Sequence, residues 1–176
     1  MPSSPIRYRL QSFPHAVETA EKADRLVIFD SRIQDLSLLV EGLQPEVNAH
    51  VLAPERDGIA QISALLCKAP TADLTLVARG FSGGLQVGAG TLSLDNLSEY
   101  EHQLRGWFAG CQDASLSLLA GNVAKGNKGH EFVSQLTSIT GATVRASAQT
   151  LGQGHWLTAT AKTFKPVVLN TYSATL

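Results

Sequence analysis

Hydrophobic residues follow two alternating patterns along the chain from Arg25 onward. Short unbroken apolar runs are typical of strands that are buried on both faces of a parallel sheet. Between these runs, apolar residues recur every three or four positions, which is the spacing of one helix face. Such a run predicts a strand at residues 25–29, and further short segments with more mixed composition predict strands at residues 47–52, 74–78, 116–120 and 143–148. The spaced segments predict helices at residues 33–43, 59–68, 94–111 and 130–141.

Other local signals complete this pattern. Asp95 or Asn96 is the expected cap of the third helix, and Gly141 is expected to end the fourth. Two short extended pieces joined through Gly88-Ala89-Gly90 predict a hairpin. The alternation in 155–164 favours an edge strand, and 166–176 is expected to form a closing helix. Because strands alternate with helices, we expect a three-layer α/β domain with a mainly parallel sheet covered on both faces.

The first 24 residues differ from the rest of the chain. Pro2, Pro5 and Pro14 interrupt them, so we expect an extended N-terminal arm over residues 1–24 and one α/β domain over residues 25–176. An arm of this kind is a candidate contact for a larger assembly.

The amino-acid composition and net charge argue against several classes of partner and binding site. With 14 basic and 15 acidic side chains the net charge is -1, so no overall field attracts nucleic acid or an anionic membrane. Cys67 and Cys111 are the only cysteines and lack metal-binding spacing, so we expect neither a disulfide framework, nor a metal site, nor a cofactor. No apolar run approaches the roughly 20 residues that span a bilayer. Residues 1–25 lack the apolar segment of a signal peptide, so the expected compartment is the cytoplasm.

The loops after the predicted strands hold the candidate chemistry. In parallel α/β sheets, ligands bind beyond the carboxyl ends of the strands. These loops are residues 30–32, 54–57, 79–82 and 121–125.

One of these loops contains Gly80-Phe81-Ser82-Gly83-Gly84, which fits the G-x-S-x-G pattern of a serine-hydrolase nucleophile. That function requires a strand, a sharp turn and a helix packed behind the serine. After Gly84 the sequence predicts a hairpin instead, and no helix signal begins before about Asp95. We therefore expect the glycines to let the chain leave the sheet tightly, without a nucleophile at Ser82.

Residues 121–128 approach the phosphate-binding P-loop pattern. Asn127 stands at the lysine position of that pattern and Lys128 at its Ser/Thr position, which disfavours nucleotide hydrolysis. Two interpretations remain open: an anion site at a helix N-terminus with Lys125 and Lys128, or a solvated loop with two surface lysines. Arg56 and Asp57 likewise form either an ion pair that fixes a loop or part of a ligand site.

Seven segments together resemble a known bacterial family. In chain order they are RLVIFDSRIQDLSLLVEGL, VLAPERDGIAQI, LTLVARGFSGGLQVGAGTLSLDNL, NVAKG, FVSQLTSITGATVRAS, LGQGHWLT and FKPVVLNTYSATL. They resemble an uncharacterised domain that is common in cyanobacteria and proteobacteria, near the N-terminus of very large surface proteins with cadherin-like or calcium-binding repeats. The resemblance runs from about Arg25 to Leu176. That domain is similar to the caspase–haemoglobinase fold group, so the resemblance implies a caspase-like fold.

The resemblance also implies where a catalytic pair would lie. In the family, the third strand ends in Ser-His-Gly and the fourth in Gly-Cys before Asn-Val-Ala. Here Arg79 stands at the His position and Gly121 at the Cys position. Arginine stays protonated near neutrality, and glycine has no nucleophile. The resemblance therefore implies a caspase-like domain without the His/Cys dyad.

From these observations we expect a catalytically inactive domain that serves as a protein-binding or scaffolding module, attached to a larger assembly through the arm. Two alternatives remain. One is a hydrolase that uses Ser82 as a non-standard nucleophile. The other is an anion- or peptide-binding sensor that uses the vacated cleft. The candidate cleft residues are Arg79, Ser82, Asn122, Lys125, Arg56 and Asp57.

Overall fold

A five-stranded parallel sheet forms the centre of the protein, and the computed structural model describes it within residues 25–176, apart from the side chains of residues 158 and 159. The strand order is β2-β1-β3-β7-β8. The predicted arm, residues 1–24, lies outside the described residues. The strands are β1 (Leu26–Asp30), β2 (Asn48–Leu52), β3 (Asp73–Val77), β7 (Ser115–Leu119) and β8 (Thr143–Ala146).

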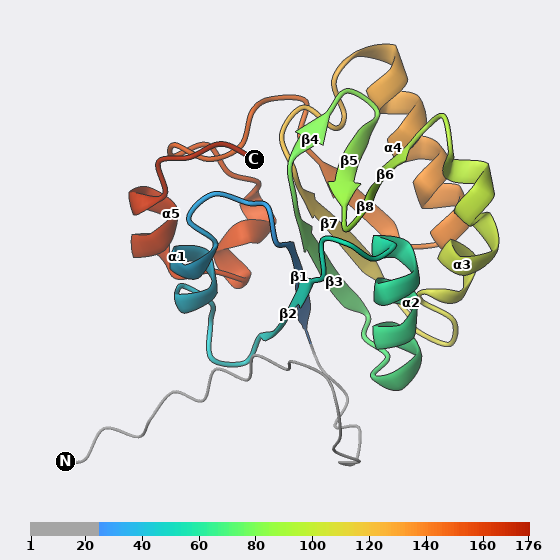
Figure 1. The fold of residues 1–176 in the computed structure, drawn as a ribbon, viewed down its shortest axis with the longest axis horizontal. Coiled ribbons are helices and arrows are strands. Elements are labelled where there is room, and N and C mark those ends of the chain that lie inside the picture. The colour runs from blue at the N-terminus through green and yellow to red at the C-terminus, as the bar shows by residue number, and fades with distance from the viewer. Residues whose placement is uncertain (1–24) are drawn as a thin grey trace.

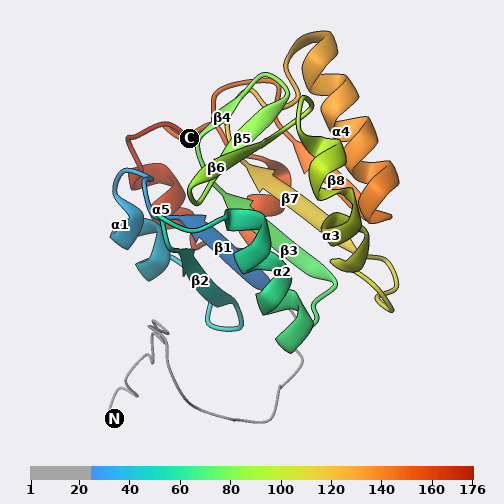
Figure 2. The same ribbon diagram turned by 45° about the vertical axis from the view of Figure 1, so that its right-hand side comes forward.

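A smaller antiparallel sheet follows β3. It consists of β4 (Gly80–Phe81), β5 (Gly84–Val87) and β6 (Gly90–Ser93), in the order β4-β5-β6. Figures 1 and 2 both place this sheet at the same end of the molecule as the end of the chain. The predicted hairpin is therefore confirmed, with one additional short strand.

Helices cover both faces of the parallel sheet (Figure 1). They are α1 (Leu36–Glu41), α2 (Gly58–Lys68), α3 (Glu101–Gly106), α4 (Gly126–Thr140) and α5 (Pro166–Thr171), with short 3-10 helices at Leu97–Tyr100 and Thr158–Lys162. Among residues 25–176, none of these helices has both the length and the apolar character needed to cross a lipid bilayer. The predicted α/β class, with a mainly parallel sheet, is confirmed.

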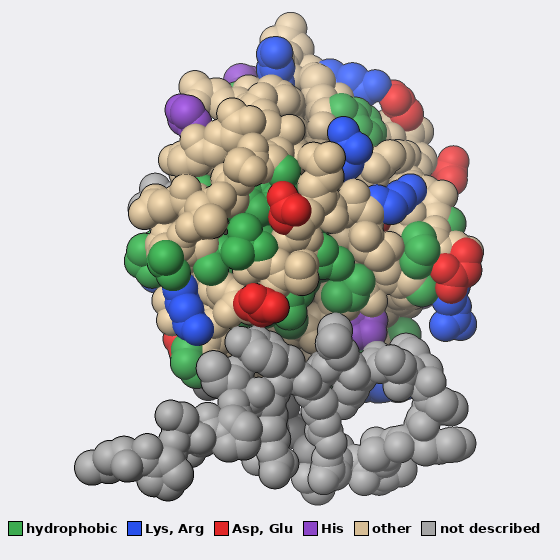
Figure 3. Space-filling view, turned by 60° about the vertical axis from the view of Figure 1, so that its left-hand side comes forward, with side chains coloured by type: hydrophobic (Ala, Val, Ile, Leu, Met, Phe, Trp, Pro, Cys, Tyr) green, Lys and Arg blue, Asp and Glu red, His purple; other side chains and the backbone are tan. Residues whose placement is uncertain are grey.

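Two hydrophobic clusters lie on opposite faces of the sheet, because successive side chains of a strand point to opposite sides. Leu26 and Ile28 of β1 pack with α2, α3 and α4, whereas Val27 and Phe29 pack with α1 and α5. The second face is covered by short helices only, since α1 and α5 have 6 residues each, whereas α2 and α4 on the first face have 11 and 15. Figure 3 shows apolar side chains in separate groups on this side of the molecule.

Two predicted helices are shorter than their patterns suggested. The first begins at Leu36 rather than Ile33, because Asp35 has the left-handed backbone angle φ 52°. The third divides into a 3-10 turn and the short α3; Asn96 stands at the N-cap of the 3-10 turn, as expected, but its side chain makes no capping hydrogen bond. Asn96 instead accepts a hydrogen bond from the Ser93 N–H at 2.8 Å, and Asp95 pairs with a lysine. Local polar contacts here replace the helix that the apolar spacing predicted.

The last part of the chain departs most from the predictions. Residues 155–164 contain a 3-10 helix at Thr158–Lys162 rather than an edge strand, and they bury Thr160 and Phe164 at helical spacing. The closing helix stops at Thr171; the backbone is extended at Tyr172 and bends at Ala174. In contrast, the predicted end of α4 is confirmed, because Gly141 has a left-handed φ of 69°.

Candidate functional site

The end of β1 is closed by charged side chains. Asp30 is only 2% exposed, and its carboxylate accepts hydrogen bonds from the Arg32 main-chain N–H at 3.0 Å and from Nε at 3.0 Å and Nη2 at 3.1 Å of the same arginine. It also accepts the Gly88 N–H at 2.9 Å. The hydrogen bond from its guanidinium to Asp30 raises the pKa of Arg32. The turn between β5 and β6 is thereby fastened over the end of β1.

This closure matters because of its position in the sheet. The chain leaves β1 to one side for β2 and returns on the other side for β3, which makes the crevice between β1 and β3 the place where open α/β sheets bind ligands. Arg32 additionally donates to the Gly88 carbonyl oxygen. The carboxylate at this crevice is thus fully occupied by groups of the protein itself.

The end of β7 is closed by main chain alone. The Gly121 N–H donates to the Leu176 carbonyl oxygen at 2.9 Å. A Cβ atom added to Gly121 would overlap that same oxygen, so the position has no room for a side chain. Gly80, after β3, packs against the Gly121 carbonyl oxygen in the same way. Three segments of main chain are therefore in direct contact at this point.

Three of the predicted site residues do come together. The Ser82 hydroxyl donates to the Lys125 carbonyl oxygen at 2.7 Å, and the Lys125 N–H donates to the Asn122 carbonyl oxygen at 3.0 Å. Asn122 adopts a left-handed φ of 62°. These bonds hold the turn of the small sheet against the loop that precedes α4. The Ser82 hydroxyl hydrogen is engaged in this structural contact.

Arg56 and Asp57 lie at the other end of β5. The Ala89 N–H donates to the Arg56 carbonyl oxygen at 2.8 Å, whereas Ser82 stands before β5 begins. The four residues of β5, Gly84–Val87, lie between the two groups and span about 10 Å as a strand. Asp57 caps α2 by accepting the Ala60 N–H at 2.7 Å. The predicted candidates therefore form two separate groups.

Tyr100 adds a second contact to Asp57. Its hydroxyl donates to the carboxylate at 2.9 Å, and this bond raises the pKa of Tyr100. Asp57 thus has a structural role at the start of α2, which is the ordinary role of an aspartate at that position.

Arg79 is exposed directly after β3. Burial and the negative charge of Asp35 raise the pKa of Tyr172 to about 12. The positive charge of Arg79 partly opposes this rise. Lys128, the second lysine of the predicted anion site, forms an ion pair with Asp95 at 2.7 Å. Part of the positive charge expected in this region is therefore compensated within the protein.

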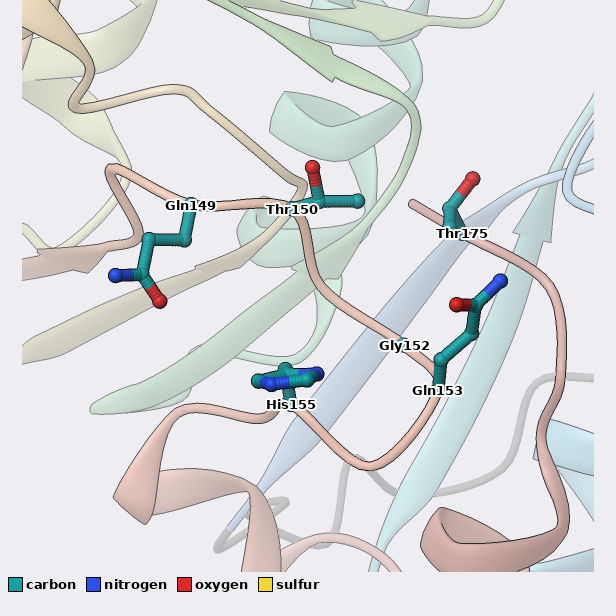
Figure 4. Close-up of a pocket in the computed structure, with 6 residues that line it drawn as sticks. All are labelled: Gln149, Thr150, Gly152, Gln153, His155 and Thr175. Carbon is teal, nitrogen blue, oxygen red and sulfur yellow. The ribbon is translucent and has the colours of Figure 1, made fainter.

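A group of residues that the sequence did not single out lines an open hollow beside the end of the chain. Figure 4 shows side chains from the loop after β8 facing Thr175 across it. The lining residues are Gln149, Thr150, Gly152, Gln153, His155 and Thr175. The sequence marked this loop only through the segment LGQGHWLT, one of those that resemble the family, in which Gly152 and Gly154 both adopt positive φ.

Comparison with known proteins gives a family but no activity. Residues 26–176 match the family described as a domain of unknown function, DUF4347. None of the curated proteins and none of the solved structures matches the chain. The matched range starts with β1 and covers every described strand and helix. The chain therefore belongs to the DUF4347 family of domains of unknown function.

Proposed function

We propose that this chain is a catalytically inactive, caspase-like domain that serves as a protein-binding or scaffolding module. The resemblance noted in the sequence implies a catalytic His and Cys at the ends of neighbouring parallel strands. Arg79 follows β3 and Gly121 follows β7, and these two strands are adjacent and parallel. The small antiparallel sheet follows directly after Arg79. This arrangement supports the transfer of the two positions to this chain.

The observation that carries the proposal is the filled space at Gly121. A nucleophile needs a side chain that projects from the strand end toward a substrate carbonyl group. At Gly121 the Leu176 carbonyl oxygen occupies the place of the first side-chain atom. Arg79 cannot accept a proton in place of histidine, because its guanidinium stays charged. A cysteine restored at position 121 would collide with main chain before it met a substrate.

The two alternative functions have less support. The Ser82 hydroxyl is bonded to a main-chain carbonyl oxygen, so a hydrolase would first have to break a contact that holds two loops together. An anion sensor would draw on Arg79, Lys125 and Arg56. Arg56 lies at the far end of β5 from Lys125, so these charges do not converge on one ligand.

Covalent labelling tests the absence of catalysis. The intact chain is incubated with a peptide-based thiol-directed probe and with a fluorophosphonate that modifies activated serines. We expect no labelling that depends on a single folded site. Cys67 is exposed and reacts with any thiol reagent, so Cys67→Ser is the background control. Serine labelling that disappears in Ser82→Ala, while the fold is retained, would refute the proposal in favour of the hydrolase.

A further inference from the structure

The last five residues, Tyr172–Leu176, form a non-helical segment with a bend at Ala174, and we call this segment the strap. The Leu176 N–H donates to the Leu151 carbonyl oxygen at 3.0 Å, and the Leu176 carbonyl oxygen accepts the Gly121 N–H at 2.9 Å. The Gln153 N–H donates to the Tyr172 carbonyl oxygen at 3.2 Å. Gly152 and Thr175 form an antiparallel bridge. Main-chain pairing of this kind is how proteins bind extended peptides.

The surface under the strap is shaped for main chain with one apolar anchor. Gly152 has φ 99°, and a Cβ added to it would overlap the Ala174 carbonyl oxygen. Leu176 is only 5% exposed and packs in the same cluster as Leu119 and Leu151. Ser173, by contrast, is exposed. We call the receiving surface, formed by Gly121 and residues 151–153, the groove.

The strap is attached to the fold at few points. It belongs to neither sheet, and it follows the short helix α5. Tyr172 and Leu176 are buried, whereas the side chains of residues 173–175 between them are exposed or half-buried. Release of residues 173–176 therefore breaks no strand pairing of either sheet. Segments with so few buried apolar contacts open at lower free energy than the strands of a core.

We infer that the groove is a peptide-binding site that the strap occupies in cis, and that an extended segment of a partner protein binds by displacing the strap. This inference rests on the proposed function, because it assigns the partner-binding surface to the inactive site. The partner segment supplies main-chain hydrogen-bonding groups, a large aliphatic residue at the Leu176 position and a polar residue at the Thr175 position. The polar residue faces the hollow lined by Thr150, Gln153 and His155 (Figure 4).

The test measures binding of a fluorescent peptide with the sequence of residues 171–176, TYSATL, to the full chain and to Leu176→Ser. The substitution removes the aliphatic anchor of the strap and leaves the groove intact. We expect the peptide to bind Leu176→Ser at least tenfold more tightly than the unaltered chain, because the strap competes at high effective concentration. A peptide that ends in Ser instead of Leu should bind at least tenfold more weakly.

The matched control is Val167→Ser. This change removes an aliphatic side chain that is 66% exposed on α5, so it should leave peptide binding as in the unaltered chain. Equal binding to all three proteins, or binding to none, would overturn the inference. Exchange of straps between two copies, detected as a dimer of the unaltered chain in size-exclusion chromatography, would overturn it too.

Hydrogen exchange on the unaltered chain keeps the inference testable even if Leu176→Ser does not fold. The Gly121 and Leu176 amides should exchange at least a hundredfold faster than the Leu118 amide in β7, because only strap release exposes them. Equal exchange rates would mean that the strap is a permanent part of the core. Failure of these experiments would leave the absence of catalysis untouched, since that proposal is tested by covalent labelling.

Discussion

Two closures at the same edge of the sheet use opposite chemistry. At the end of β1, a buried carboxylate is satisfied by an arginine and by the Gly88 N–H. At the end of β7, the Gly121 N–H and the Leu176 carbonyl oxygen meet without any side chain. The first closure depends on the charge of particular side chains, whereas the second depends on the absence of one. Each fills, with groups of the protein itself, a place at which an α/β sheet could hold a ligand.

The two closures differ in the substitutions that they tolerate. The charged closure fails when its chemistry changes, even if the volume is kept, because a buried charge needs its partner. The main-chain closure fails when volume is added, whatever the chemistry, because the main chain of the strap, and not the end of a flexible side chain, must shift to make room. The two closures are joined by Tyr172, whose hydroxyl donates to the Gln34 carbonyl oxygen in the loop after β1 at 3.0 Å.

The largest effect is expected at the charged closure. Asp30→Ala removes the acceptor of four hydrogen bonds and leaves the Arg32 guanidinium and the Gly88 N–H without their partner. We expect a loss of about 3 kcal/mol in the free energy of unfolding. Urea denaturation measures it.

Asp95→Ala is the control for that experiment, because the Asp95–Lys128 ion pair is exposed. Its loss should cost less than about 1 kcal/mol. Equal effects of the two substitutions would show that the closure at β1 contributes no more than a surface ion pair.

The main-chain closure should show the next largest effect. In Gly121→Ala the added Cβ overlaps the Leu176 carbonyl oxygen, so the strap must shift. We expect a loss of about 2 kcal/mol, measured by thermal denaturation. Gly106→Ala is the matched control, because nothing lies within 4 Å of a Cβ at that position of α3. The control should be neutral or stabilising by up to about 1 kcal/mol. A Gly121→Ala protein as stable as the control would contradict a closed β7 end.

The smallest effect concerns the link between the closures. Tyr172→Phe removes the hydrogen bond to Gln34 and should cost about 1 kcal/mol at neutral pH. Burial raises the pKa of Tyr172 to about 12, whereas an unfolded tyrosine titrates near about 10. The unfolded chain therefore loses this proton first, and stability falls as the pH rises from about 10 toward 12. In Tyr172→Phe this part of the fall should be absent. Parallel denaturation curves at several alkaline pH values compare the two proteins, and identical pH profiles would contradict a buried phenol.

The strands could be predicted from sequence because their burial is a local pattern. Residues 26–29 are apolar without interruption, residues 116–119 are interrupted only by the buried Ser117, and both faces of the strands they form are buried. The predicted helices lie at the correct places, but some predictions were too long. At Asp35, for example, a left-handed backbone conformation delays the start of the helix that the apolar spacing predicted. The edge strand proposed for residues 155–164 was wrong, because alternation over a short segment also fits a turn that buries Thr160 and Phe164.

The sequence by itself determined the α/β class and the alternation of strands with helices that makes the sheet mainly parallel. It also determined that neither histidine nor cysteine stands at positions 79 and 121. These properties follow from residue types and from the periods of burial, which a single segment displays. Only the tertiary structure decided that Gly121 is held against Leu176 and that Tyr172–Leu176 is not helical. A contact between main-chain atoms 55 positions apart (176 minus 121) has no side-chain signature, because every residue carries the same N–H and carbonyl groups.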